Sequence, residues 1–383
     1  MWGTLFKRDF ESTTGCIRHI FIVLDANVLC LGNDNGISDG RRELTMERKL
    51  ASIQRIKDLS PIEGADRIEK ATVLGWGLVV QKGEFKVGDL CVFCEVDSVL
   101  PERPEFEFLR DRKFRIKTIK LKGQVSQGIC FPISILPEGY FDLSVEYEGV
   151  DVTELLGVKK YEPQIPAQLM GQAKGNFPGF LRKTDEMRIQ SVPRVLERQR
   201  GKFFYVTEKL DGTSATYFSR DEDFGICSRN IWLKDNEANE NNSYVKMAKM
   251  LDIQSRLKPY GNIAIQGEIV GPGIQKNKYG LSELDFFLFS IFFIDVYKYA
   301  NFYGFLKFAE LLNLKTVPIL ERKLELNHSV EELIEMSKGK SELAQIFREG
   351  IVIRTVGEED IDEEIGRISF KVINPDFLLK YEV

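Results

Sequence analysis

The sequence has few histidines, no second close pair of cysteines and no long apolar run. Two histidines in 383 residues exclude a zinc site built on several imidazoles and the HExxH chemistry of metalloproteases. The only Cys-x-x-Cys spacing is Cys91–Cys94, in a strand-like apolar stretch, so we expect both thiols to pack in a core. No stretch approaches the roughly 18 apolar residues of a membrane span. We therefore expect a protein without a membrane segment, located in the cytoplasm or nucleus and not secreted.

Length and charge limit the organisation and the partners. The 383 residues suit two domains of ordinary size, and a hydrophobic share of 43% is enough to build their cores. With 58 acidic and 53 basic residues, the net charge is −5, which argues against a protein that coats nucleic acid with positive charge. The total does not exclude a local basic groove.

Residues 1–45 differ in pattern from the rest. Their apolar run at 20–24 is too short for a signal peptide, and Asp9 and Glu11 are unusual in a transit peptide. A regular alternating pattern begins at Met46. We expect residues 1–45 to be a poorly ordered leader, variable or spurious, and the folded protein to begin near Met46.

Short strand-like runs separated by turns follow the leader. Residues 50–56 alternate between apolar and polar, residues 72–80 resume the pattern with Gly75 and Gly77 inside it, and residues 90–96 form an apolar run. Glycines inside a strand suggest a bulge or a barrel bend. About five short strands in some 100 residues favour a small barrel of the OB type.

One segment of this module is strongly basic. Between Arg110 and Lys122 there are seven basic residues and one acidic residue. Because Arg115 and Lys117 alternate with apolar neighbours, we expect a strand with its cations on one face. That face is either a solvated sheet edge or a groove that follows a phosphate backbone. The candidate nucleic-acid-binding residues are Arg112, Lys113, Arg115, Lys117, Lys120 and Lys122.

A lysine between two predicted strands is the strongest candidate for chemistry. An apolar strand leads into Glu208-Lys209-Leu210-Asp211-Gly212, and a second β-rich run follows. The Lys-x-Asp-Gly motif alone is weak, but it has companions in a fixed order. They are Phe180–Gln190 upstream and Ser228-Arg229-Asn230, Gln266-Gly267-Glu268, Phe286–Ser290, Glu349–Arg354 and Ile368–Ile373 downstream.

This series resembles the covalent nucleotidyltransferases, which include polynucleotide ligases and mRNA capping enzymes. It is most similar to ATP-dependent RNA ligases of the Naegleria type, over residues 46–383. The resemblance implies an α+β fold with an OB-like module at 46–155, a linker at 156–175 and a ligase domain of antiparallel sheets with flanking helices at 176–383. It also implies a monomer that uses ATP with Mg²⁺ or Mn²⁺ to join RNA 3′-OH and 5′-phosphate ends, as at a nick.

The resemblance also implies a role for each matching residue. Lys209 becomes bound to AMP, and Lys371 contacts the α-phosphate. Two carboxylates, Glu268 at the ribose and Glu349 near the phosphates, are the candidate metal ligands. The other implied nucleotide contacts are Glu208, Asp211, Gly212, Arg229 and Phe287, which stacks on adenine, with Phe289 on the same strand face as second choice.

The chemistry of lysine adenylation requires the same kinds of residue. A lysine ammonium is not a nucleophile, so we expect partial burial and nearby positive charge to lower the pKa of Lys209. That charge would come from a metal ion or from another lysine, such as Lys371 or Lys183. Carboxylates are needed to hold a divalent cation against the triphosphate. Phosphoryl transfer depends mainly on positioning and on neutralisation of charge.

The chain departs from the family pattern at two positions. Many relatives have Asp where Ser290 stands, and a lysine where Ser369 stands, so Arg367 is a candidate to replace that cation. Two alternatives stay open: a DNA nick ligase, and a binding protein with a degenerate ligase body. Because the chain ends 12 residues after Lys371, we expect no OB domain after the catalytic domain, which favours the RNA ligase interpretation.

Overall fold

A computed structural model describes residues 22–24, 27–29, 48–137, 140, 146–161, 172–236, 239–357, 361–362 and 364–381. The chain divides into one unit at Met1–Thr45 and a second at Met46–Val383. In the first unit, strands β1 (Ile22–Leu24) and β2 (Asn27–Leu29) pair in antiparallel fashion. The expected poor order of the leader otherwise lies outside the described residues and stays a prediction.

The second unit begins with a small β-barrel-like module, as expected. Its five-stranded antiparallel sheet has the order β10-β6-β3-β4-β5. The long strand β3 pairs with both β4 and β6, and its core includes Trp76, Cys91, Phe93 and Cys94, all fully buried. The elements are β3 (Ala51–Pro61), β4 (Ile68–Val73), β5 (Trp76–Gln81), β6 (Leu90–Cys94), β7 (Ser98–Val99), β8 (Ile119–Leu121), β9 (Gln124–Ser126), β10 (Ile129–Pro132), η1 (Pro104–Arg112), η2 (Ile133–Ile135) and α1 (Thr153–Leu156).

The expected single strand at 72–80 is wrong. It is a tight hairpin of β4 and β5, with Leu74 in the left-handed conformation (φ 53°) at the turn. A Cβ at Gly75 would lie 3.0 Å from Cα of Gln190 in the ligase domain, and the Gly75 amide donates to the Gln190 carbonyl oxygen at 3.0 Å. Gly75 is therefore needed for close contact between the two domains, and not for a bulge.

The expected basic strand at 110–122 is also wrong. Its first part belongs to the 3₁₀ helix η1, Lys113 and Phe114 are both left-handed, and only Ile119–Leu121 forms a strand (β8). Pro104 is favourable in the first turn of η1. Phe106 and Leu109, which are three residues apart, lie on one face of this helix and are both buried. The buried pair, and not the run of charge, decides the local structure.

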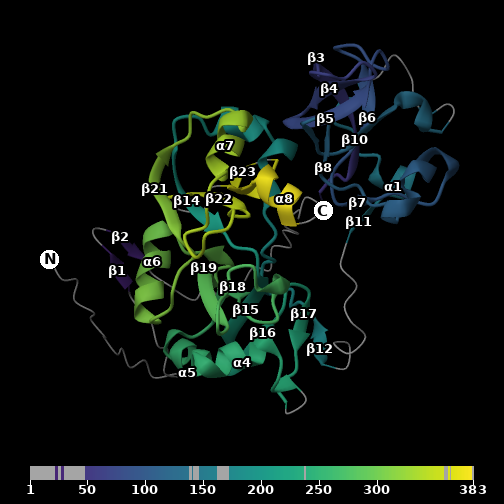
Figure 1. The fold of residues 1–383 in the computed structure, drawn as a ribbon. Coiled ribbons are helices and arrows are strands. Elements are labelled where there is room, and N and C mark those ends of the chain that lie inside the picture. The colour runs from purple at the N-terminus through teal and green to yellow at the C-terminus, as the bar shows by residue number, and fades with distance from the viewer. Residues whose placement is uncertain are drawn as a thin grey trace. The chain divides into compact units, whose positions relative to one another are not determined.

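The ligase domain consists of two sheets that face each other across a cleft. One has the order β12-β17-β16-β15-β18-β19-β20, and the other β13-β25-β22-β14-β21. All neighbouring pairs are antiparallel except β13–β25. Figure 1 shows helices α4 and α5 beside β15 and β16. Helix α7 packs on β25 of the other sheet. The expected α+β class with mostly antiparallel sheets is confirmed.

The remaining elements of the second unit, from residue 159 onward, are as follows. The strands are β11 (Lys159–Lys160), β12 (Ala173–Asn176), β13 (Met187–Arg188), β14 (Phe203–Lys209), β15 (Thr213–Arg220), β16 (Asp223–Cys227), β17 (Ile231–Leu233), β18 (Ile263–Val270), β19 (Asp285–Phe293), β20 (Lys298–Tyr299), β21 (Ile319–Glu325), β22 (Gly350–Thr355), β23 (Ile361–Asp362), β24 (Gly366–Arg367) and β25 (Ser369–Ile373). The helices are η3 (Ile189–Ser191), α3 (Arg194–Arg198), α4 (Ser243–Met250), α5 (Ile253–Leu257), η5 (Lys258–Tyr260), η6 (Gln275–Asn277), α6 (Phe302–Leu311), α7 (Val330–Ser337) and α8 (Pro375–Tyr381).

The expected linker at 156–175 is only partly described. Lys159–Lys160 pairs with β7 of the OB-like module, Ala173–Asn176 pairs with β17 of the ligase domain, and residues 162–171 lie outside the description. The exact boundaries stay a prediction. Within the described part of the chain, no helix has the length and apolar character to cross a membrane.

Candidate active site

The cleft between the two sheets contains a cavity of about 510 Å³ around Lys209. Lys209 is the last residue of β14 in one sheet, and Thr213 is the first residue of β15 in the other. The turn between them therefore crosses the cleft, as the sequence predicts. A Cβ at Gly212 would lie 2.3 Å from the carbonyl oxygen of Ile269, so this turn requires glycine.

Lys209 lies against a carboxylate from the neighbouring strand. Its Nζ is 2.7 Å from Oε2 of Glu349, and their side chains are only 26% and 13% exposed. Lys209 pairs with Gly350 across β14 and β22, which places Glu349 at the same end of the sheet. From the other sheet, Glu268 accepts a hydrogen bond from the Gly212 amide at 3.1 Å. Both expected metal ligands therefore line the cavity with Lys209.

The charges keep Lys209 protonated. Burial acts to lower the pKa of Lys209, but Glu349, Glu268 and Asp211 raise it above its ordinary value. Burial also raises the pKa of Glu268 to about 8, with help from Glu349, and raises that of Glu349. The expected lowered pKa of Lys209 is therefore wrong for the protein alone: the cavity holds more carboxylates than cations at this point.

Lys371 is the second lysine of the cavity. It lies on β25, opposite Val352 of β22. Burial and the charge of Lys209 lower the pKa of Lys371 to about 7. A small change in its surroundings therefore switches its charge near neutral pH.

Asp211 has partners that the motif did not reveal. It forms an ion pair with Lys278, and its amide donates to the Tyr279 hydroxyl at 2.8 Å. The Lys278 ammonium also lies 5.4 Å from the Phe377 ring centroid, on helix α8. Lys278 and Tyr279 follow Asp211 in the sequence by 67 and 68 residues. No local sequence pattern could therefore have identified them as its partners.

Other residues of the predicted set are placed as follows. Glu208 is 1% exposed and accepts a hydrogen bond from the Glu342 amide at 2.8 Å, so it supports the cavity wall. Arg229 lines the cavity mouth and pairs with Asp185 at 2.6 Å. Lys160, from the strand that pairs with the OB-like module, reaches the same Asp185 at 3.2 Å.

Of the two phenylalanines considered for adenine, Phe289 lines the cavity and the first choice, Phe287, does not. Phe287 is 7% exposed and packs in an apolar cluster with Leu210 and Val317. The register between β18 and β19 shifts at Gln266 and Gly267, so Phe289 is an extra residue in β19. A β-bulge of this kind redirects side chains, which simple alternation does not predict.

Arg354, and not Arg367, lines the nucleotide cavity and donates a hydrogen bond to Ser369. Its Nε donates to Ser369 Oγ at 3.2 Å, its Nη2 is 3.0 Å from Glu186 Oε1, and it lines the cavity. Arg367 does not line this cavity; its guanidinium lies 3.6 Å from the Tyr299 ring centroid. The expected replacement of a missing lysine by Arg367 is therefore not supported by the geometry.

The basic segment of the OB-like module has two kinds of cation. Arg115 is 2.7 Å from Asp97 and stacks on Tyr161 at 3.7 Å, so it is held inside the protein. Asp97 also binds Arg188 of the ligase domain at 3.0 Å. Lys117 is half-buried, whereas Arg112, Lys113, Lys120 and Lys122 are exposed.

The candidate metal ligands of the cavity are two carboxylates, Glu268 and Glu349. The described residues contain no group of three or more carboxylate, histidine or cysteine ligands that could hold a metal ion. Glu268 and Glu349 nevertheless fit a hard divalent cation, since both line the cavity and burial raises the pKa of each, with the charge of Glu349 adding to the effect on Glu268. Mg²⁺ is commonly held by one or two carboxylates with phosphate and water as the other ligands.

Comparisons with known proteins agree with this geometry. A family model described as an OB-fold domain matches residues 50–133, and one described as RNA ligase matches residues 202–373. The Naegleria gruberi RNA ligase, solved with pyrophosphate, is 36% identical, with a TM-score of 0.78 over 88% of this chain and 99% of that chain. The chain belongs to the RNA ligase family.

Further structures of the Naegleria enzyme carry other ligands. A mutant with ATP and Mn matches over 87% of this chain and 99% of that one, and a mutant with AMP and Mn over 88% and 99%; both are 36% identical with a TM-score of 0.78. No curated protein matches this ligase significantly.

Proposed function

We propose that this ligase is ATP-dependent and joins RNA ends through a lysyl-AMP intermediate on Lys209. The observation that carries the proposal is the contact of 2.7 Å between Lys209 Nζ and Glu349, inside a cavity that also contains Glu268 and Lys371. The Naegleria relative was solved with ATP, AMP and Mn, which supports the same ligands here.

The first step follows from these positions. The Lys209 nitrogen, after losing a proton, attacks the α-phosphorus of ATP, and the bond to the pyrophosphate oxygen breaks. Lys371, Arg354 and Phe289 line the cavity, which supports a role for the two cations in neutralising the phosphate charge and for Phe289 in stacking on adenine. A divalent cation held by Glu268 and Glu349 would neutralise the triphosphate and lower the pKa of Lys209.

Two further steps complete the joining. AMP passes from Lys209 to the 5′-phosphate of an RNA end, and the 3′-OH of the other end attacks this RNA-adenylate and releases AMP. The exposed cations Arg112, Lys113, Lys120 and Lys122 are the proposed contacts with the RNA backbone. Two residues of the set predicted from the sequence are left out of this proposal. Arg115 is paired with Asp97, and Lys117 is half-buried.

The test is a labelling experiment. The protein is incubated with α-labelled ATP and Mg²⁺ or Mn²⁺ and run on a denaturing gel; we expect label on the wild type and none on Lys209→Ala. Equal label on both proteins would reject covalent catalysis at Lys209. Sealing of nicks with RNA or DNA at the 3′-OH side then tests the substrate, and we expect RNA to be preferred.

A further inference from the structure

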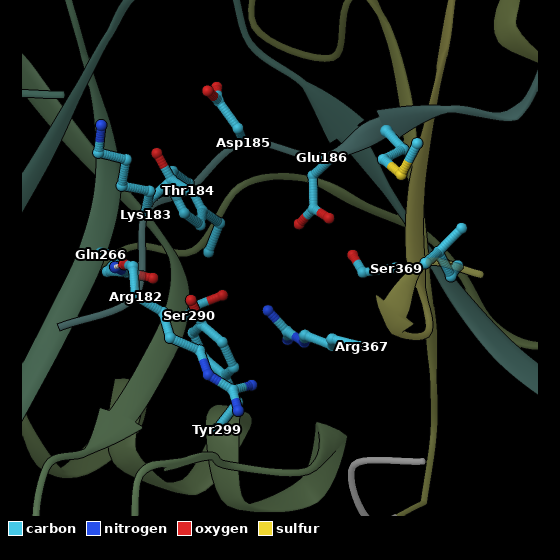
Figure 2. Close-up of a pocket in the computed structure, with 13 residues that line it drawn as sticks. Arg182, Lys183, Thr184, Asp185, Glu186, Gln266, Ser290, Tyr299, Arg367 and Ser369 are labelled. Carbon is cyan, nitrogen blue, oxygen red and sulfur yellow. Dashed lines mark hydrogen bonds between the residues drawn. The ribbon is translucent and has the colours of Figure 1, made fainter. Parts of the chain in front are cut away.

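Buried carboxylates around the nucleotide cavity are matched by cations in separate groups. Figure 2 shows the Glu186 carboxylate and the Arg367 guanidinium pointing into a smaller cavity, of about 110 Å³, which shares a wall with the first. Glu186 also lies 3.0 Å from Arg354, and the charge of Arg367 acts on it as well. The ion pair of Asp211 and Lys278 is another such group. Removal of its cation would leave a largely buried carboxylate without its partner, which is strongly unfavourable.

Lys278 belongs to an unusual loop between β18 and β19. Three consecutive residues of this loop, none of them glycine, have positive φ: Gln275 at 44°, Lys276 at 59° and Asn277 at 46°. A left-handed backbone is unfavourable for glutamine and lysine, because Cβ then lies too close to the following carbonyl oxygen. Such a conformation persists only where the surrounding structure holds it. The contacts of the loop must therefore offset this strain.

The loop is fixed to the turn between β14 and β15 by three contacts. Lys278 forms the ion pair with Asp211, and the Tyr279 hydroxyl accepts a hydrogen bond from the Asp211 amide at 2.8 Å. Gln275 Nε2 donates to the carbonyl oxygen of Gly212 at 3.3 Å. One loop therefore holds both the carboxylate and the backbone of this turn.

The Lys278 ammonium is also held by helix α8. It lies 5.4 Å from the ring centroid of Phe377 and 5.9 Å from that of Tyr381. Aromatic rings attract a cation at this distance, and the attraction is stronger where water is excluded. Contacts with both the rings and Asp211 leave the ammonium little freedom to take another partner.

The pairing of Asp211 has a consequence for the neighbouring lysine. Asp211 comes two residues after Lys209, and its charge acts on Lys209, whose ammonium contacts Glu349 at 2.7 Å. Without Lys278, the Asp211 carboxylate would compete with Glu349 for the Lys209 ammonium. The nitrogen of Lys209 would then be drawn from its place, and a displacement of about 1 Å costs roughly a hundredfold in rate.

We propose that Lys278 is a positioning residue for adenylation: it keeps the Asp211 carboxylate paired, so that Lys209 stays in its place beside Glu349. This inference rests on the proposed function, in which Lys209 is the nucleophile. Gln275 and the rest of the loop hold the turn and Lys278 together. Substitution of Lys278 therefore slows the transfer of AMP and leaves the affinity for ATP nearly unchanged.

The experiment measures single-turnover adenylation of the full chain with α-labelled ATP and Mn²⁺ at several ATP concentrations. It yields the rate constant at saturating ATP, the ATP concentration that gives half this rate, and the final amount of label. In Lys278→Met we expect the rate constant to fall about tenfold or more and the half-saturating concentration to change by less than about threefold. A purely structural role would lower only the final amount of label, because less protein is folded.

Three further variants test how Lys278 acts. Lys276→Met is the matched control, since Lys276 is an exposed lysine of the same loop, and its rate constant should equal that of the wild type. Lys278→Arg restores a cation that pairs with a carboxylate and stacks on aromatic rings, so it should recover part of the lost rate. In an Asp211→Asn background, Lys278→Met should cause little further loss, because the carboxylate through which Lys278 acts is gone.

Several results would overturn the proposal. They are a wild-type rate constant in Lys278→Met, a loss confined to the affinity for ATP, and a loss that adds in full to that of Asp211→Asn. Should Lys278→Met not fold, Lys278→Gln, which keeps a hydrogen-bond donor but no charge, replaces it with the same expected results. Absence of label on the wild-type protein would instead reject the proposed function, and this inference with it.

Discussion

The nucleotide cavity and the basic segment of the OB-like module hold their charges in opposite ways. In the cavity, Lys209 and Glu349 are 26% and 13% exposed and lie 2.7 Å apart. In the module, Lys120 and Lys122 are exposed, with no ion pair within the described residues. Buried charges interact strongly but only with near neighbours, whereas exposed charges act over a longer range and are screened by salt.

This difference separates two tasks of one protein. The cavity must fix a reacting atom to within a fraction of an ångström, and closely paired groups do this. In the proposed function, the module attracts the RNA backbone without choosing a sequence, and exposed lysines suffice for that task. We therefore expect changes in the cavity to alter chemistry sharply and changes in the module to alter affinity gradually.

The largest effect is expected at Lys209 itself. Lys209→Arg keeps a cation opposite Glu349 but replaces the nucleophile, because a guanidinium does not lose its proton in proteins. Adenylation should fall below detection, while the midpoint of thermal unfolding stays within a few degrees of the wild type. Lys298→Arg, on the exposed strand β20, is the control. Residual labelling of Lys209→Arg would place the covalent bond on another residue.

Breaking a buried pair should cost much more stability than breaking a surface pair. Lys278 and Asp211 are 13% and 12% exposed, whereas Lys307 and Glu310 are 44% and 73% exposed. Lys278→Met should lower the free energy of unfolding by roughly 2–3 kcal/mol, and Lys307→Met by less than about 0.5 kcal/mol, as measured by urea denaturation. Equal losses in both variants would contradict the contrast between the two kinds of pair.

The pH dependence of ATP binding should report on Lys371. Because its pKa is lowered to about 7, the charged fraction of Lys371 decreases as the pH rises through 7. ATP affinity, measured in EDTA to prevent reaction, should therefore fall between pH 6 and 8, by at most about tenfold per unit. In Lys371→Met this slope should disappear. A slope that survives the substitution would assign the titration to another group or to ATP.

The smallest effect is expected in the module. Lys120→Ala with Lys122→Ala should lower RNA affinity several-fold at low salt and reduce the slope of log K against log salt by about 1.4. Adenylation should be unchanged. Lys82→Ala with Lys86→Ala makes the same charge change at exposed residues of the same module. An equal loss in that control would show that net charge, and not the basic segment, determines RNA binding.

The site was predictable where local pattern and chemistry agree. Lys209 ends a strand, Glu349 precedes one, and strand pairing places them together. The resemblance placed both residues at the nucleotide, although it did not predict their contact. The choice between Phe287 and Phe289 depended on a register shift against β18, which a single strand does not reveal. The role of Lys278 could not be predicted from the sequence, because only folding brings this residue into contact with Asp211.

The fold was predictable at the level of domains and less so in detail. The OB-like module of short strands followed from alternation and turns, whereas the order of its strands did not. The seven cations of the basic segment predicted a strand. The burial of Phe106 and Leu109, just before the segment, instead organises a short helix. Charge patterns show where a surface is, but buried apolar side chains determine the backbone beneath it.

The wall of the nucleotide cavity has a consequence for how such enzymes can be rearranged. Lys160 and Tyr161 line that cavity, although the strand Lys159–Lys160 pairs with Ser98–Val99 of the OB-like module. Neither domain can therefore be replaced without an effect on the other. Exchange of the module for another domain would remove the strand that pairs with Lys159–Lys160 and so change the wall of the nucleotide cavity. A change made to alter the substrate would therefore also alter nucleotide binding.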